Sequence, residues 1–277
     1  MSLAQAVARF AAGLLGRDSA VVAALRPTYE RLLVRLSGNR GLGWELNGVP
    51  CRIDPRARAS LPRAYEAGAA GFLATHVRAG DLCFDIGAHI GAYVIQLAHW
   101  TRPTGRTVAF EPNPSAQEIL WRHVRMNGLT ARVELVPSAV GAESGVRTLH
   151  VLGTDGRSRL DAPNPEIAGR THPLEVPVTT LDDFCRTRGL QPAWVVMDVE
   201  GFEIAVLRGA RATLALEPRP RMVVELHPSV WTQSGTSRDE AEALLRKLRL
   251  TVVSLSGHRD PLGQHGLVYL SSNDRPR

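Results

Sequence analysis

The chain has 277 residues, 44% of them hydrophobic, which suits one large α/β domain and excludes a chain that is disordered throughout. The formal net charge is +6, but no window concentrates basic and aromatic residues, so charge alone makes nucleic-acid binding an unlikely function. Three separated cysteines without a CxxC pair argue against a disulfide framework or a zinc cluster.

The N-terminal part of the chain predicts a helical extension over residues 1–36, with a break near Pro27. Its apolar face could pack on the main domain, on a second subunit in a homodimer, or on a membrane surface, and packing on the main domain is the simplest interpretation. No apolar run reaches the roughly 18–20 residues of a membrane span. The N-terminus lacks the basic start of a secretory signal. We therefore expect a cytoplasmic protein without a membrane span.

A short hairpin follows over residues 44–54, with Asn47-Gly48 as its turn. Residues 61–79 predict a helix that carries Tyr65 and Phe72 toward the core.

From residue 80, strand-like and helix-like segments alternate, which is typical of a parallel sheet in an α/β fold. The predicted strands are 81–86, 106–111, 132–136, 194–199 and 221–226, with two closing strands at 250–255 and 266–271. The predicted helices are 90–101, 114–127, 180–188, 202–215 and 237–248.

Residues 145–180 break this alternation. They contain a strand-like stretch, VRTLHVL, and then a loop rich in Gly, Pro and Asn at 153–173. A long loop inside a compact domain is often functional. After it, Thr180 with Asp183 predicts a helix cap, so we assign Asp182 and Asp183 to structure.

The strongest local signal is DLCFDIGAHIGAY, in which a buried strand ends at Asp85. Gly87 permits a tight turn and a close approach of the backbone to a ligand, and Gly91 lets the next helix begin near the strand. The N-terminus of that helix offers free backbone N–H groups and the positive end of its dipole. The pattern predicts a nucleotide-type site, although glycines alone are a weak signal.

The next strand ends at Glu111, about 20 residues after Gly91, where a carboxylate can accept hydrogen bonds from both ribose hydroxyls. A helix N-terminal acid before Pro112 is the structural alternative. The spacing is D-x-G-x-x-x-G rather than G-x-G-x-x-G, and an acid before the loop suits a ligand with a cationic, non-phosphorylated end. S-adenosylmethionine, with its sulfonium and amino groups, fits this pattern better than NAD.

The ordered motifs FDIGAHIGAY, VAFEPNP, LDDF, MDVEGFEIAVLRGA and VVELH resemble the FkbM family of methyltransferases over roughly residues 65–230. The resemblance implies a Rossmann-like, seven-stranded class I methyltransferase sheet with helices on both faces. It makes residues 61–277 the methyltransferase domain, and residues 1–60 the N-terminal helical extension and short hairpin. It also implies S-adenosyl-L-methionine as the cofactor. His89 departs from the family, in which asparagine is common at that position.

The resemblance places the glycine loop at the methionine end of the cofactor, Glu111 at the ribose and the Pro137–Val140 segment beside the adenine. The expected cofactor-binding residues are Asp85, Gly87, Ala88, His89, Gly91, Glu111, Pro112, Asn113, Ser138 and Ala139.

Methyl transfer from a sulfonium is an in-line displacement, so the protein mainly positions the acceptor and removes its proton. Asp198, at the carboxyl end of the fourth strand, is the first candidate for contact with the reacting atoms, with a helix N-cap as its alternative. Glu225 and His227 end the fifth strand and complete the predicted catalytic set. His227 has an ordinary pKa that suits a base, although a single histidine is more often structural.

Two further features leave alternatives open. Asp198, Glu200 and Glu225 carry the oxygen ligands that a divalent metal takes, but no spacing demands a metal and we assign no metal ligand. Arg157, Ser158 and Arg159 could contact the acceptor or could be ordinary loop residues.

The sequence therefore predicts a methyltransferase that uses S-adenosylmethionine to methylate a hydroxyl oxygen on a sugar or natural-product small molecule. The alternatives are an RNA or protein methyltransferase, suggested by charge alone, and a non-catalytic or NAD-binding nucleotide module.

Overall fold

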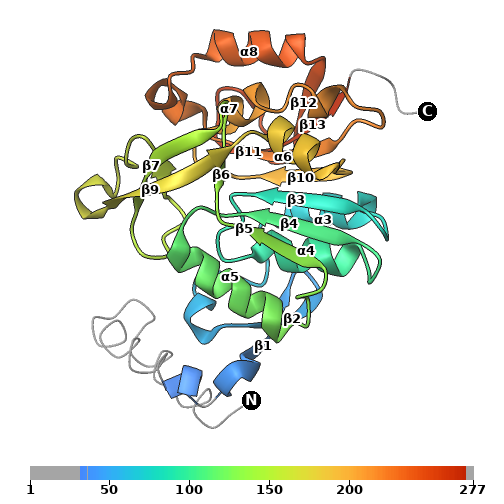
Figure 1. Ribbon diagram of the computed structural model, residues 1–277, viewed down its shortest axis with the longest axis vertical. Helices are drawn as coiled ribbons and strands as arrows, with labels where there is room; N and C mark the ends of the chain where they lie inside the picture. Colours follow the sequence, from blue (N-terminus) through green and yellow to red (C-terminus); the bar gives the residue numbers. More distant parts are fainter. Residues whose placement is uncertain (1–31, 36, 273–277) are drawn as a thin grey trace.

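The computed structural model describes residues 32–35 and 37–272, and its centre is a seven-stranded sheet (Figure 1). The strands are β3 (Leu82–Ile86), β4 (Arg106–Phe110), β5 (Val133–Val136), β10 (Trp194–Met197), β11 (Arg221–Leu226), β12 (Leu250–Ser254) and β13 (Gly266–Ser272). Their order is β12-β13-β11-β10-β3-β4-β5, and only β13 runs antiparallel to the others. The chain order reverses between β3 and β10, which is where open α/β sheets bind their ligands.

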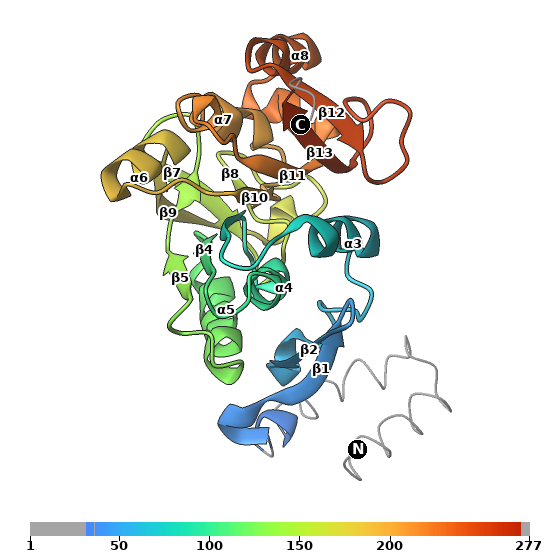
Figure 2. The same cartoon turned by 90° about the vertical axis from the view of Figure 1, so that its right-hand side faces the viewer.

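Helices cover both faces of this sheet (Figures 1 and 2). One face packs against α3 (Ala67–His76), α4 (Ala92–Trp100) and α5 (Pro114–Met126), and the other against α6 (Leu181–Arg188), α7 (Glu203–Arg208) and α8 (Arg238–Lys247). Because side chains alternate along a strand, Cys83 joins the core on the α3 and α4 side, whereas Phe84 packs with Phe184 of α6. The predicted Rossmann-like sheet of seven strands with helices on both faces is confirmed.

Two predicted helices are shorter than expected. The helix predicted over 61–79 begins only at Ala67, because Glu66 adopts a left-handed backbone conformation with φ of 44°. The helix predicted over 202–215 ends at Arg208, and Gly209 separates it from a 3₁₀ turn at Thr213–Ala215. The other short 3₁₀ helices are Gly38–Arg40, Pro55–Ala57, Ala168–Arg170 and Pro228–Ser234.

A second, four-stranded sheet occupies the region that the sequence predicted to be mainly loop. It contains β6 (Ala139–Val140), β9 (His172–Thr179), β7 (Gly145–Val151) and β8 (Arg159–Leu160), in that order. The prediction missed β9, because prolines at positions 173 and 177 argue against a strand. The loop predicted over 153–173 therefore contains the short strand β8, and it ends where β9 begins at His172.

The predicted hairpin is confirmed as β1 (Leu42–Leu46) and β2 (Val49–Ile53), turning at Asn47-Gly48 with positive φ at both positions. Figure 2 shows it beside α4 and α5, and its buried side chains join theirs in one core cluster. The predicted boundary after residue 60 stays a prediction. The helix predicted over 1–36 falls mostly outside the described residues.

Between residues 32 and 272, leaving aside position 36, no helix has the length and apolarity needed to cross a membrane. All three cysteines are free and buried.

The turn after β3 depends on the absence of a side chain at Gly87. Its φ is 82°, and a Cβ there would lie 1.7 Å from the backbone oxygen of Asp198. Gly87→Ala should therefore lower the free energy of unfolding by about 3 kcal/mol or more, as measured by denaturant unfolding. Gly128→Ala is the control, because Gly128 also has a positive φ but a Cβ there would contact nothing within 4 Å. Equal losses in the two variants would contradict the predicted overlap.

Candidate active site

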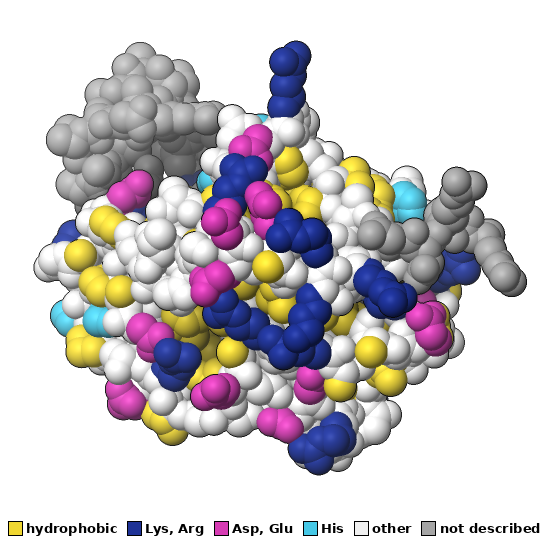
Figure 3. Space-filling model, turned by 90° about the horizontal axis from the view of Figure 1, so that it is seen from above, with side chains coloured by type: hydrophobic (Ala, Val, Ile, Leu, Met, Phe, Trp, Pro, Cys, Tyr) yellow, Lys and Arg dark blue, Asp and Glu magenta, His cyan; other side chains and the backbone are white. Residues whose placement is uncertain are grey.

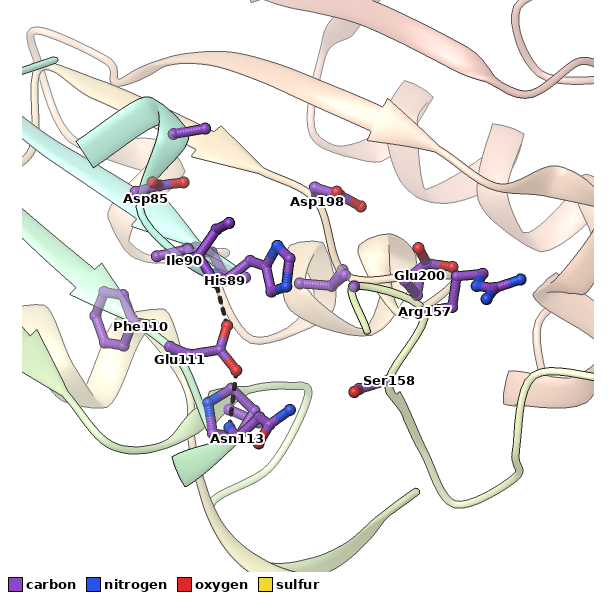
Figure 4. A pocket seen from close by; sticks show the side chains of 18 of the residues that line it. Asp85, His89, Ile90, Phe110, Glu111, Asn113, Arg157, Ser158, Asp198 and Glu200 are labelled. Atoms are coloured by element: carbon purple, nitrogen blue, oxygen red, sulfur yellow. Dashed lines mark hydrogen bonds between the residues drawn. The ribbon is translucent and has the colours of Figure 1, made fainter. Parts of the chain in front are cut away.

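A cavity of about 280 Å³ lies where the carboxyl ends of β3, β4 and β10 meet (Figure 4). Three neighbouring parallel strands end on the same edge of the sheet, so the residues that follow them converge on one place. Asp85 comes from β3, Glu111 follows β4, and Asp198 follows β10. The cavity therefore brings together the motifs that the sequence singled out.

The glycine loop wraps around the end of β3. The backbone N–H groups of Gly87 and Ala88 both donate to the carbonyl of Phe110, at 3.0 Å, which fixes the loop against β4. Gly91 has a φ of 90° and begins α4. These bonds turn the loop so that residues 87–90 line the cavity.

Asp85 is almost fully buried, and its Oδ2 has no hydrogen-bond partner among the described residues. Burial, followed by the negative charges of Glu111 and Glu66, raises the pKa of Asp85 to about 8. An unpaired, buried carboxyl oxygen on a cavity wall is a group that a ligand with a polar or cationic end would satisfy.

Glu111 is also buried, but both of its carboxylate oxygens are engaged. Oε2 accepts from the N–H of His89 at 2.7 Å, and Oε1 accepts from the N–H of Asn113 at 2.8 Å (Figure 4). Burial raises the pKa of Glu111 to about 7, although these two bonds act in the opposite direction. Each oxygen keeps a second lone pair, so Glu111 can still accept further hydrogen bonds.

Most of the predicted cofactor residues line the cavity, with two exceptions. Those that do are Asp85, Gly87, Ala88, His89, Glu111, Pro112, Asn113 and Ala139. Gly91 lies behind the loop, where a Cβ would approach the Leu120 side chain at 3.2 Å. Ser138 is buried just before β6, outside the cavity wall, and its Oγ has no partner among the described residues. The cofactor roles of all ten residues stay predictions.

The loop between β7 and β8 closes one side of the cavity. His89 Nε2 lies 2.8 Å from the carbonyl oxygen of Thr154, and since a carbonyl can only accept, the ring N–H donates. Asn113 Nδ2 donates to the carbonyl of Gly153 at 2.8 Å. His89 and Asn113 thus hold segment 153–158, which contributes Asp155, Gly156, Arg157 and Ser158 to the cavity wall.

The three loop residues considered as acceptor contacts have different positions. Arg157 and Ser158 line the cavity, and Arg157 also pairs with Asp155 at 2.6 Å. Arg159 is buried away from it, and its Nε donates to the backbone carbonyl of Glu200 at 2.8 Å. Arg159 therefore fixes the backbone beside Glu200 instead of facing the cavity.

The part of the cavity wall that follows β10 carries Asp198 and Glu200. Asp198 lies deep in the molecule, yet 36% of its side chain is accessible because it borders the cavity. Burial and the charge of Glu225 raise the pKa of Asp198 well above its usual range. The carboxyl group does not cap the following helix, which has no side-chain cap and Phe202 at its N-cap position.

His227 stands behind this wall and is held by Glu203, whose carboxylate is fully buried. His227 Nδ1 lies 2.8 Å from Glu203 Oε1, and its Nε2 lies 3.9 Å from Asp198 Oδ1 and 4.0 Å from Glu200 Oε2. Burial favours the neutral ring, but the bond and charge of Glu203, with Asp198 and Glu200, raise the pKa of His227 to about 9.

Glu225 is a predicted catalytic residue that does not line the cavity. Its Oε1 pairs with His265 Nε2 at 2.7 Å, and the His265 ring stacks on the His227 ring with centroids 4.5 Å apart. Neither Glu225 nor His227 lines the cavity, so both lie behind Asp198 as seen from the cavity.

The sequence missed two tyrosines on the cavity wall, Tyr65 and Tyr93. Tyr93 Oη donates to Glu66 Oε2 at 2.7 Å, and the two rings meet edge to face at 5.8 Å. Tyr93 follows Gly91 in the glycine-loop motif, so the expected direction of α4 could have indicated it. Tyr65 precedes α3, and no motif marked it.

Comparison with known proteins agrees with this geometry. Residues 85–250, more than half of the chain, match the family model of the methyltransferase FkbM domain. The chain belongs to the FkbM methyltransferase family. It is thus an S-adenosylmethionine-dependent methyltransferase, and the redox and non-catalytic alternatives are excluded.

Among relatives, the 31-O-demethyl-FK506 methyltransferase FkbM of Streptomyces tacrolimicus is 29% identical over 214 residues, covering 67% of this chain and 77% of that protein. The crystal structure of methyltransferase FkbM from Methylobacillus flagellatus aligns with a TM-score of 0.46 and 20% identity, over 69% of this chain and 44% of that one. Aeropyrum pernix fibrillarin, solved with S-adenosyl-L-methionine, aligns with a TM-score of 0.43 and 15% identity, over 73% of each chain.

The residues of this FkbM methyltransferase fit its cofactor. The unpaired Oδ2 of Asp85 can accept from an ammonium group, and Glu111 retains lone pairs for ribose hydroxyls. The apolar side chains of Ile90, Phe110 and Ala139 also line the cavity, as contact with a flat base requires.

The bond from His89 to Thr154 yields a structural prediction. Segment 153–158 is held by one hydrogen bond from His89 and one from Asn113. His89→Ala removes the first of them, so amide hydrogen exchange in that segment should increase several-fold. Exchange in α4 should stay unchanged. His172→Ala, at an exposed position on β9, is the control. Equal exchange of the segment in His89→Ala and wild type would show that the bond does not hold it.

Proposed function

We propose that this FkbM methyltransferase transfers the methyl group of S-adenosylmethionine to a hydroxyl oxygen of a sugar or natural-product small molecule. The observation that carries the proposal is the position of Asp198, a carboxyl group on the cavity wall beside the glycine loop. The name of the Streptomyces relative, which describes O-methylation of the natural product FK506, supports the same acceptor class.

In this proposal the glycine-loop side of the cavity binds the donor. Asp85 accepts from the amino group of the methionine end, and Glu111 accepts from the ribose hydroxyls. The segment that starts at Ser138 and Ala139 flanks the adenine. Bound S-adenosylmethionine supplies an electrophilic methyl carbon for in-line displacement. Segment 153–158 excludes water from that side because His89 and Asn113 hold it in place.

The Asp198 side of the cavity handles the acceptor. Asp198 accepts a hydrogen bond from the acceptor hydroxyl and so draws its proton away as the oxygen attacks. His227 and Glu225, one layer behind, set the charge around Asp198. Tyr65 and Ser158 offer hydroxyl groups on the same cavity, as expected for a polar acceptor such as a sugar.

The charge of the chain gives a macromolecular acceptor less support. Figure 3 shows arginines interspersed with acidic side chains over the face that carries α8. On that face Arg238 pairs with Asp260 at 2.7 Å and with Glu242 at 2.9 Å. Paired arginines of this kind do not form the uniform basic surface that nucleic acids favour. We therefore place RNA and protein acceptors second.

The raised pKa values of Glu111 and Asp85 predict how donor-site affinity depends on pH. Both acids must be ionised to accept every bond proposed, and their pKa values are about 7 and 8. The affinity for S-adenosylhomocysteine should therefore rise between pH 6 and pH 8, by at most about tenfold per pH unit for each group. Isothermal titration calorimetry measures it.

Glu111→Gln should weaken binding at pH 8 and reduce the rise with pH. Glu118→Gln is the matched control, because Glu118 is exposed on α5. A pH profile of Glu111→Gln identical to that of wild type would remove Glu111 from the donor site.

The acceptor class is tested by transfer of a labelled methyl group to pooled sugars, polyketides and RNA. We expect label on hydroxyl oxygens of the small molecules. Asp198→Asn should lower turnover by about 100-fold or more, while S-adenosylhomocysteine affinity stays near wild type. Asp239→Asn, an exposed acid on α8, should be fully active. Label confined to RNA would overturn the proposed acceptor, and normal turnover in Asp198→Asn would remove its catalytic role.

A further inference from the structure

Three side chains that can ligate a metal meet at the cavity wall. The atoms with which they face one another form no hydrogen bonds among themselves. The donor atoms of Asp198, Glu200 and His227 all lie within 4.8 Å of one another. His227 Nε2 is 3.9 Å from Asp198 Oδ1 and 4.0 Å from Glu200 Oε2, which is too far for hydrogen bonds. Two ligands that each lie about 2.1 Å from one divalent ion are at most about 4.2 Å apart, so both distances are compatible with a shared ion.

His227 is oriented as metal-binding histidines usually are. It is more than nine-tenths buried, and its Nδ1–H donates to Glu203 at 2.8 Å. Glu203 also accepts from the backbone N–H of Gly201 and from Trp231 Nε1, both at 2.8 Å, so its carboxylate is fixed. A histidine that donates from one nitrogen to a buried carboxylate directs its other nitrogen toward the metal, which binds there in place of a proton. The Nε2 of His227 is directed toward Asp198 and Glu200.

Asp198 supplies a second, independent observation. Its Oδ1 is buried and has no hydrogen-bond partner among the described residues, although it is the atom that faces His227. A buried carboxylate oxygen normally has a partner, so this atom indicates a ligand that the protein itself does not supply. The backbone beside Glu200 is fixed in turn by the guanidinium of Arg159.

A neighbouring set of possible ligands is less suitable. Glu225, His227 and His265 also lie close together, but Glu225 and His265 already satisfy each other at 2.7 Å. In addition, the stacked rings of His227 and His265 lie face to face. In the first set, by contrast, the atoms through which Asp198 and His227 face each other lack such a partner among the described residues.

We propose that Asp198, Glu200 and His227 bind one divalent metal ion at the acceptor side of the cavity. One imidazole and two carboxylates suit Mn²⁺ and related first-row ions. Three protein ligands leave open positions, and Asp198 and Glu200 border the cavity, so acceptor hydroxyl oxygens can reach those positions. Only this last step, the contact with the acceptor, rests on the proposed function.

The test is a titration of the full chain, stripped of metal with EDTA, with Mn²⁺ alone, and electron paramagnetic resonance measures the free ion. We expect one Mn²⁺ per chain. His227→Gln and Glu200→Gln should each weaken binding by at least about tenfold. Circular dichroism shows whether each variant folds, and two variants are used so that the loss of one fold leaves the other informative. His265→Gln is the matched control and should bind Mn²⁺ like wild type.

Folded wild-type protein that binds no stoichiometric Mn²⁺ would overturn the proposal. Binding that is lost in His265→Gln but kept in Glu200→Gln would also overturn it, by moving the ion to the neighbouring set. S-adenosylhomocysteine binding is measured on the same samples to separate the two proposals. Mn²⁺ binding without S-adenosylhomocysteine binding supports the metal site and overturns the proposed donor site. The reverse result overturns the metal site alone.

Discussion

The close approach of β3 and β10 at their carboxyl ends is the constraint on which the rest of the site depends. The N–H of Asp198 donates to the carbonyl of Ile86 at 2.9 Å, and the next residue, Gly87, lies against the Asp198 carbonyl with no space for a side chain. This contact places the glycine loop and Asp198 on adjoining parts of one cavity wall. Because the neighbouring strands are in register with these two, Glu111 falls beside the loop, and Glu225 with His227 falls behind Asp198.

Burial of acidic groups gives this cavity its chemical character. Asp85 and Glu111 have pKa values raised to about 8 and 7, because taking a carboxylate out of water disfavours its charged form. A buried carboxyl oxygen without a partner costs roughly 1–3 kcal/mol, and Asp85 and Asp198 each have one. The fold tolerates this cost because its core is extensive on both faces of the sheet. A ligand that supplies the missing hydrogen bonds or positive charge therefore binds more tightly here than at a site whose carboxyl oxygens already have partners.

Hydrogen bonds connect the second sheet to the residues around the cavity. His89 and Asn113 hold the segment beyond β7, and Arg159 of β8 holds the backbone beside Glu200. Both sides of the cavity are thus connected to the same β7–β8 region. Next to Asp198, Glu203 accepts from three donors and fixes His227, so the imidazole cannot turn away from Asp198 and Glu200.

The sequence by itself determined the seven strands, the hairpin and the glycine-loop wall of the cavity, because each depends on residues close together in the chain. Asp85, Gly87 and Glu111 occupy strand ends, and a parallel sheet brings strand ends together. It did not predict β9, whose prolines resemble a loop, or Tyr65, which no motif marks. It also left a helix N-cap as the alternative role of Asp198, and it did not mark Glu203 as a site residue. Only the tertiary structure decided these, since hydrogen bonds and ion pairs between β10, α7 and β11 depend on distances across the fold. Glu203 proved to be the partner of His227, and Asp198 faces the cavity with an unpaired oxygen.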